Sequence, residues 1–282
     1  MKIAQVNLNG LFAVVQKQGD GAWRTIDNVR DMADVMSLNA ASLLAAYDRG
    51  QVVNPQPGDF LAPIMRPGKI IAIGRNYAEH AQEQRVAPPT SPLIFAKLPS
   101  SITNPDGVIE WDPSLATEVD YEAELAVIIG TTARRVSPET ALRHVFGYTC
   151  ANDVTARDLQ NKDGQWTRAK GLDTFCPLGP WIVTADEIPN PQRLAIRCDV
   201  NGTRLQDSNT EHMIFDVKTL IAHTSAAFTL HPGDIILTGT PGGIGHARTP
   251  PILLREGDSV VVEIEGIGRL ENTCHETSVE GY

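Results

Sequence analysis

Residues 119–130 read VDYEAELAVIIG, and this stretch decides the fold of the chain. Polar and apolar residues alternate along it, which predicts a strand that carries Glu122 and Glu124 on one face. Further along, the same face becomes apolar at Ala126 and Ile128. The two carboxylates therefore lie at the mouth of a buried strand, where desolvation and mutual repulsion require a cation, shared protons or water. The alternative is a solvated strand end.

A second stretch, VFGYTCANDVTARDLQ over residues 145–160, places Asp153 at the end of an apolar run. Taken alone, Asp153 fits the N-cap of a helix or turn. Together with Glu122 and Glu124 it would instead form an all-oxygen site with no Cys or His beside it. Such a site suits Mg²⁺ or Mn²⁺ better than Zn²⁺ or copper.

The rest of the chain predicts a mainly β protein with some α structure, an α+β fold. From residue 69 onward, many short apolar runs predict strands, and only two stretches, 76–84 and 211–229, predict helices. This pattern indicates a curled or barrel-like sheet and not a doubly wound fold. Residues 1–66 predict a small N-terminal α+β domain, and a Pro- and Gly-rich connector separates it from a second domain over 67–282.

The composition limits the class of partner. Among 282 residues, 24 Lys and Arg face 34 Asp and Glu, which gives a formal charge of −10. An acidic chain argues against nucleic acid and anionic membranes as partners. The N-terminal residues alternate in polarity and no uncharged apolar run reaches about 20 residues, so we expect a cytoplasmic protein without a signal peptide or membrane span.

A candidate base lies in the segment GRNYAEHAQE, residues 74–83. His80 and Glu83 are three residues apart, so on a helix they share a face and the carboxylate could orient the imidazole. Such a pair also occurs by chance on surface helices.

Four basic residues follow predicted strands or flank the candidate acids: Arg75, Lys97, Arg157 and Lys170. A site for a small di- or tricarboxylate needs such residues, although each one alone also fits an ordinary ion pair. The glycine-rich run TGTPGGIG, residues 238–245, could let backbone N–H groups approach an anion, with Thr240 adding a hydroxyl. A tight structural loop is the alternative.

Together these stretches resemble the fumarylacetoacetate hydrolase superfamily, in a member with a small N-terminal accessory domain. The likeness extends over residues 67–274 and runs through PGKIIAIGRNYAEHAQE (67–83), PLIFAKLPSSI (92–102), VDYEAELAVIIG (119–130), VFGYTCANDVTARDLQ (145–160), AKGLDTFCPLGPWI (169–182), NGTRLQDSNTEHMIFDV (201–217), HPGDIILTGTPGGIG (231–245) and LLREGDSVVVEIEGIGRLEN (253–272).

The resemblance implies a mixed β roll with its site at the mouth, and a homodimer. It implies metal ligands at Glu122, Glu124 and Asp153, and a general-base dyad of His80 and Glu83 assisted by Lys170. We expect the substrate, a small carboxylate, to contact six residues: Arg75, Tyr77, Lys97, Arg157, Gln160 and Thr240.

The function that the resemblance implies is hydrolysis of a C–C bond in an acylpyruvate or fumarylpyruvate type of 2-oxo acid, with Mg²⁺ or Mn²⁺ stabilising an enolate. Such enzymes belong to aromatic or sugar-acid catabolism. The alternatives within the superfamily are a decarboxylase of the oxaloacetate type, an isomerase of the 2-hydroxyhepta-2,4-diene-1,7-dioate type and a lyase of the ureidoglycolate type. A metal-binding paralogue without catalysis is a remote alternative.

Overall fold

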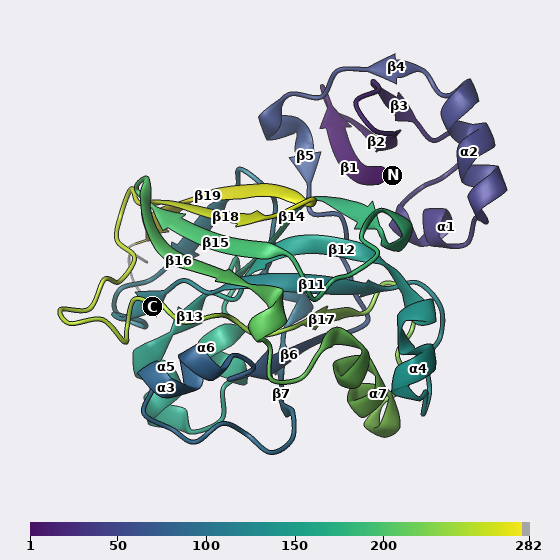
Figure 1. Ribbon diagram of the computed structural model, residues 1–282. Coiled ribbons are helices and arrows are strands. Elements are labelled where there is room, and N and C mark those ends of the chain that lie inside the picture. The colour runs from purple at the N-terminus through teal and green to yellow at the C-terminus, as the bar shows by residue number, and fades with distance from the viewer. Residues whose placement is uncertain (278–282) are drawn as a thin grey trace.

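The two stretches that carry the acidic residues form neighbouring antiparallel strands in the middle of a large mixed sheet. The computed structural model describes residues 1–277 (Figure 1). In spatial order the sheet contains β4 (Val52–Val53), β3 (Trp23–Thr25), β2 (Leu11–Lys17), β1 (Lys2–Leu8), β14 (Cys176–Thr184), β12 (Val145–Asn152), β11 (Ala123–Ile129), β17 (Ile235–Leu237), β6 (Ile70–Gly74) and β7 (Leu93–Lys97), with β5 (Phe60–Leu61) on β1 and β8 (Ile102–Thr103) on β14.

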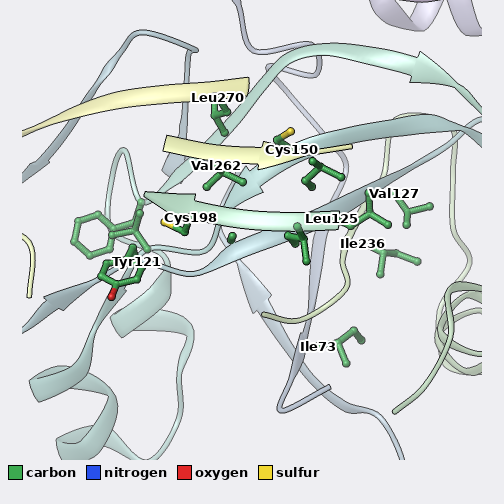
Figure 2. Close-up of a cluster of buried hydrophobic side chains, with 14 of the residues drawn as sticks. Ile73, Tyr121, Leu125, Val127, Cys150, Cys198, Ile236, Val262 and Leu270 are labelled. Carbon is green, nitrogen blue, oxygen red and sulfur yellow. The ribbon is translucent and has the colours of Figure 1, made fainter. Parts of the chain in front are cut away.

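A second sheet packs against one face of the first. Its order is β16 (Thr203–Asn209), β15 (Ala195–Val200), β18 (Ser259–Ile264), β19 (Gly268–Glu276) and β9 (Val108–Trp111), and β10 (Val119–Asp120) pairs separately with β13 (Thr155–Ala156). Figure 2 shows the apolar core between the two sheets, with Leu125 and Val127 of β11 facing Val262 and Leu270. The mainly β, α+β fold expected from the sequence is confirmed.

The alternation predicted for β11 determines which core each residue joins. Leu125 and Val127 pack between the sheets, whereas Ala126 and Ile128 belong to a second cluster on the opposite face. Because both faces of β11 are buried, all seven of its residues are inaccessible to solvent. The strand is therefore a rigid support for the acidic residue that it carries near its start.

The N-terminal residues extend the large sheet. Strand β1 pairs with β14, in the register Lys2↔Val183, and Ile3 packs in the same cluster as Ala126. The N-terminal unit lies at one corner of the molecule, well away from α3, α5 and α6 (Figure 1). The domain boundary at residue 66 stays a prediction.

The helices are short. They are α1 (Met32–Met36), α2 (Ala40–Arg49), α3 (Ala78–Glu83), α4 (Pro138–Ala141), α5 (Arg157–Asp163), α6 (Thr167–Lys170) and α7 (Val217–Ala227), with 3-10 turns η1 (Pro57–Asp59), η2 (Pro99–Ser101), η3 (Leu142–His144), η4 (Ala185–Glu187) and η5 (Thr210–His212). Among the residues described, no helix has the length and apolar character needed to cross a membrane.

The helix expected over 211–229 begins later than predicted. Asn209 caps only the short turn η5, and α7 starts after Asp216, whose side chain accepts a hydrogen bond from the Thr219 N–H. Asn76 binds the backbone between η5 and α7. Its side-chain oxygen accepts a hydrogen bond from the N–H of Phe215, and its backbone carbonyl accepts one from the N–H of Ile214. These tertiary hydrogen bonds replace the first turns of the expected helix.

Candidate active site

Three acidic residues converge where β11 and β12 meet. Glu124 lies in β11, Glu122 immediately precedes that strand, and Asp153 follows β12. The N–H of Asp153 donates to the carbonyl of Glu122 at 2.9 Å, which fixes the two chain segments together. One carboxylate oxygen of each residue lies within 4.8 Å of the others, and all three side chains are buried. The grouping predicted from the sequence is thus present.

Lys170, the last residue of α6, holds two of these carboxylates. Its Nζ donates to Glu122 Oε2 at 2.9 Å, to Asp153 Oδ2 at 2.7 Å and to Thr155 Oγ1 at 2.8 Å. An ammonium group has three hydrogens, so this geometry commits all of them, two to the acidic cluster and one to Thr155. The arrangement supports a role for Lys170 in positioning and charge balance more directly than in proton transfer.

Lys97 and Arg157 hold the same carboxylates from other sides. Lys97, at the end of β7, places Nζ 2.7 Å from Asp153 Oδ1, although not in hydrogen-bond alignment. Arg157, at the start of α5, donates to Glu122 Oε1 at 2.6 Å and to Asp120 Oδ2 at 2.9 Å. Asp120 had no predicted role, yet it also accepts the N–H of Gly245 at 2.8 Å and so ties Arg157 to the glycine-rich loop.

The charges around Glu122 and Glu124 differ. Burial alone would raise the pKa of Glu122, but Lys170 and Arg157 together outweigh it and lower that pKa to about 2. Burial, with Asp153 and Glu122 adding repulsion, raises the pKa of Glu124 well above its usual value. Glu124 accepts a hydrogen bond from the Gly239 N–H at 2.7 Å. The excess negative charge, all on oxygen ligands, fits a hard divalent cation.

The candidate base lies on α3 with its orientation fixed. His80 Nδ1 lies 2.7 Å from Glu83 Oε1, and Glu83 Oε2 accepts the N–H of Gly243 at 2.7 Å. A carboxylate only accepts, so the neutral imidazole carries its proton on Nδ1 and presents Nε2 as the basic nitrogen. The pairing predicted from the spacing of His80 and Glu83 is present.

Two residues of the acidic cluster, Glu122 and Glu124, and the His80 of the dyad line one small chamber. Its lining includes His80, Glu122, Glu124, Lys170 and Thr240, and its free volume is about 10 Å³. A larger cleft of about 370 Å³ shares part of that lining. The side chains common to both spaces are Arg75, Gln84, Arg157, Gln160 and Trp166.

Among the remaining residues predicted to contact substrate, Thr240 and Gln160 line the chamber, whereas Tyr77 lies in the core. Thr240 accepts a hydrogen bond from Gln206 at 2.8 Å, and Gln160 accepts one from Arg157 at 3.1 Å. Tyr77 lines neither space: it is fully buried, and its hydroxyl has no hydrogen-bond partner among residues 1–277. Burial and then the charge of Glu124 raise the pKa of Tyr77 well above its usual value, so it lies behind the site.

Trp166 and Gln84 line both spaces, but the sequence did not predict a role for either residue. Trp166 packs edge to face against Phe95, with ring centroids 5.3 Å apart, and lies under the Arg75 guanidinium. Gln84 follows the dyad and is four residues from His80, so helical spacing could have drawn attention to it.

A buried carboxylate cluster that could hold a metal ion, a paired histidine and a polar cleft on a mixed β roll are the features of an enzyme active site. Residues 69–275 match the family described as "Fumarylacetoacetate (FAA) hydrolase C-terminal". The chain is 49% identical over 233 residues to "Oxaloacetate tautomerase Fahd2a, mitochondrial" of Rattus norvegicus, covering 82% of this chain and 72% of that one.

Solved structures agree with this assignment. "Fumarylacetoacetate hydrolase (EaFAH)" from Exiguobacterium antarcticum is 38% identical with a TM-score of 0.87, covering 98% of this chain and 100% of the other. "5-carboxymethyl-2-hydroxymuconate delta-isomerase" from Mycobacterium smegmatis is 39% identical with a TM-score of 0.79, covering 99% and 100%. The chain belongs to the fumarylacetoacetate hydrolase superfamily and is an enzyme of that superfamily.

Proposed function

We propose that this enzyme interconverts the keto and enol forms of a 2-oxo dicarboxylate of the oxaloacetate type, with Mg²⁺ or Mn²⁺ held by Glu122, Glu124 and Asp153. The observation that carries the proposal is the shared chamber, in which the basic Nε2 of His80 and the acidic cluster face one space. The identity to a rat protein named an oxaloacetate tautomerase supports the choice of substrate class.

The balance of charge at the site supports an anionic substrate. Four buried carboxylates, on Asp120, Glu122, Glu124 and Asp153, lie among three buried cationic side chains, on Lys97, Arg157 and Lys170. A divalent cation would turn this single excess negative charge into a single positive one. Arg75 and Glu83 on the cleft wall add one charge of each sign, so the loaded site would keep a net positive charge that favours an anionic substrate.

When bound, the divalent cation would supply Lewis-acid polarisation of the 2-oxo group. His80 Nε2 takes a proton from C3 of the keto form, and the C–H electron pair becomes the C2–C3 double bond. The keto oxygen takes up a proton from water, and His80 returns its own proton to water. Glu83 holds the imidazole in the required tautomer and stabilises the charge it gains.

The two candidate reactions differ in what the base must contact. C–C hydrolysis needs an attacking water between the base and the substrate carbonyl, whereas tautomerisation needs the base to touch the substrate carbon directly.

C–C hydrolysis of an acylpyruvate remains the second candidate, because the His80–Glu83 dyad that would activate water is complete. The structural likeness to a protein named fumarylacetoacetate hydrolase supports it.

One panel separates the two candidates. Enol-oxaloacetate, acetylpyruvate and fumarylpyruvate are each mixed with enzyme and Mg²⁺, and again with EDTA. We expect metal-dependent loss of the oxaloacetate enol absorbance with no new acid formed. Release of pyruvate and a free acid from the acylpyruvates alone would favour the hydrolase.

The oligomeric state, cellular location and partners of the protein are also proposed here. We propose a homodimer located in the cytoplasm, acting on free small carboxylates and not on nucleic acid or membranes. The name of the rat relative places that protein in mitochondria.

A further inference from the structure

The amide of Gln84 bridges the cleft wall and the candidate base. Arg75 Nε donates to Gln84 Oε1 at 3.0 Å, and Gln84 Nε2 lies 3.2 Å from His80 Nε2. Gln84 lines both the inner chamber and the outer cleft. Gln84 therefore contacts the basic nitrogen and also lines the space that a substrate would enter.

The direction of this amide follows from its partners. A guanidinium has no acceptor, so the Gln84 oxygen must face Arg75 and the Gln84 nitrogen must face His80. The Nδ1 of His80 carries the proton shared with Glu83, so Nε2 accepts from Gln84. In this arrangement the lone pair that would remove a substrate proton is already engaged.

We propose that Gln84 is a gate that a second carboxylate on the substrate opens. The proposal rests on the proposed function, since it concerns the base and the 2-oxo acid of that reaction. A distal carboxylate pairs with Arg75, Arg75 releases the Gln84 oxygen, and the freed amide leaves His80 Nε2. Gln84 acts through His80 and is a positioning residue.

The exchange at Arg75 is favourable for a physical reason. Carboxylates bind guanidinium in a fork of two parallel N–H groups, and one edge of that fork contains Nε. A charged acceptor forms a hydrogen bond roughly twice as strong as a neutral amide oxygen does. Arg75 is also held over the Trp166 ring, 5.6 Å from its centroid, so its guanidinium stays at the cleft wall while it changes partner.

If Gln84 acts in this way, the substrate needs its second carboxylate both to bind Arg75 and to free His80 for proton transfer. A 2-oxo monoacid that binds at the acidic cluster leaves Gln84 on His80, so its C3 proton exchanges slowly. Removing the Gln84 amide should speed the monoacid reaction, an outcome that general damage to the site would not produce.

The test compares Gln84→Met, which keeps the length and loses the amide, with Gln82→Met, an exposed position on α3. Exchange of C3 hydrogens for deuterium is followed by NMR for pyruvate and for oxaloacetate with Mg²⁺. We expect Gln84→Met to raise the pyruvate rate and to lower the oxaloacetate-to-pyruvate ratio by about 2- to 10-fold, the factor that one neutral hydrogen bond controls. Gln82→Met should match the wild type. Equal loss of both rates, or no change in the ratio, would overturn the gate.

A second readout needs no turnover. In protein with ¹⁵N-labelled histidine, the His80 Nε2 signal of metal-free Gln84→Met should move toward that of an unbonded basic nitrogen. In the wild type with Mg²⁺, malate should cause the same movement and lactate should not. A malate that binds without moving the signal, or does not bind, overturns the gate. If these shifts occur but the wild type exchanges neither 2-oxo acid, the proposed reaction fails while the gate stands.

Discussion

Glu83 Oε2 accepts a hydrogen bond of 2.7 Å from the backbone N–H of Gly243, although 160 residues separate the two in sequence. The other oxygen of Glu83 holds His80, so this contact fixes the candidate base to the glycine-rich loop. The loop is held in turn by Tyr121, whose hydroxyl donates to the Gly243 carbonyl at 3.1 Å. The position of the base therefore depends on the conformation of one glycine.

Gly243→Ala should disrupt this contact. Gly243 has φ +99°, and an added Cβ would lie 2.3 Å from the Leu205 carbonyl oxygen, so the loop must move. We expect the tautomerase rate to fall by about 10²-fold or more, the lower end of what a positioned base contributes. Gly257→Ala is the matched control, because it has φ +78° and open space around the new Cβ. It should cost about 1–2 kcal/mol of stability and leave the rate unchanged. Similar rates for the two variants would contradict the proposed linkage.

His80→Ala should reduce the rate by about 10²- to 10⁴-fold while leaving Mn²⁺ affinity within a factor of about 3, because His80 lies outside the acidic cluster. Steady-state kinetics and titration with Mn²⁺ by electron paramagnetic resonance measure the two effects. Full turnover by His80→Ala would remove His80 from the mechanism.

Glu124→Gln should separate metal binding from folding. The variant removes the charge repelled by Asp153 and Glu122, so the metal-free protein should unfold at the same temperature as the wild type or higher. The wild type should gain about 2.7 kcal/mol at a Mn²⁺ concentration of 100 times Kd, and the variant should gain little at that same concentration. Thermal unfolding with and without Mn²⁺ tests this, and an equal metal-induced gain in both proteins would exclude Glu124 as a ligand.

Arg157→Lys should be far from conservative. The guanidinium reaches Asp120, Glu122 and Gln160 together, and a lysine cannot reproduce that fork. Lysine keeps the positive charge, but loss of one hydrogen bond to a buried carboxylate costs about 1.5–3 kcal/mol. Urea unfolding measures the loss, with Arg168→Lys in an exposed pair with Asp163 as the control. A loss below about 1 kcal/mol at Arg157 would show that Asp120 and Glu122 find other partners.

Asp34 in the N-terminal unit gives a prediction about pH. Hydrogen bonds from Arg30 lower the pKa of Asp34 from 3.8 to about 2. A lowered pKa stabilises the folded state above pH 4, and this contribution is lost as the pH falls to about 2. The wild type should therefore be more stable than Asp34→Asn above pH 4, and this difference in unfolding free energy should shrink as the pH falls to about 2. The effect is small because the pair is exposed, and urea midpoints at several pH values would measure it.

The sequence alone predicts the parts of the site that local periodicity determines. Alternation along residues 119–130 places the two glutamates on one face, and a spacing of three pairs His80 with Glu83 on a helix. The structure brings the two glutamates together and pairs His80 with Glu83, although β11 begins only after Glu122. The prediction that these two groups belong to one site, together with Lys170 and Arg157, came from the resemblance to the superfamily.

Other features depend on contacts between distant segments and could not be predicted. Asn76 replaces the start of α7 through hydrogen bonds to Ile214 and Phe215, which no local pattern reveals. Gln84, which follows the last residue of α3, gains its position in the site only through its contacts with Arg75 and His80.

The most direct test of the proposed function is stopped-flow decay of the enol absorbance of freshly dissolved oxaloacetate, measured with enzyme and Mg²⁺, with EDTA, and with His80→Ala. The account predicts fast decay only for the wild type with metal, with no loss of CO₂ during that phase. Equal decay in EDTA or with His80→Ala, or CO₂ release at the same rate as enol loss, would contradict it.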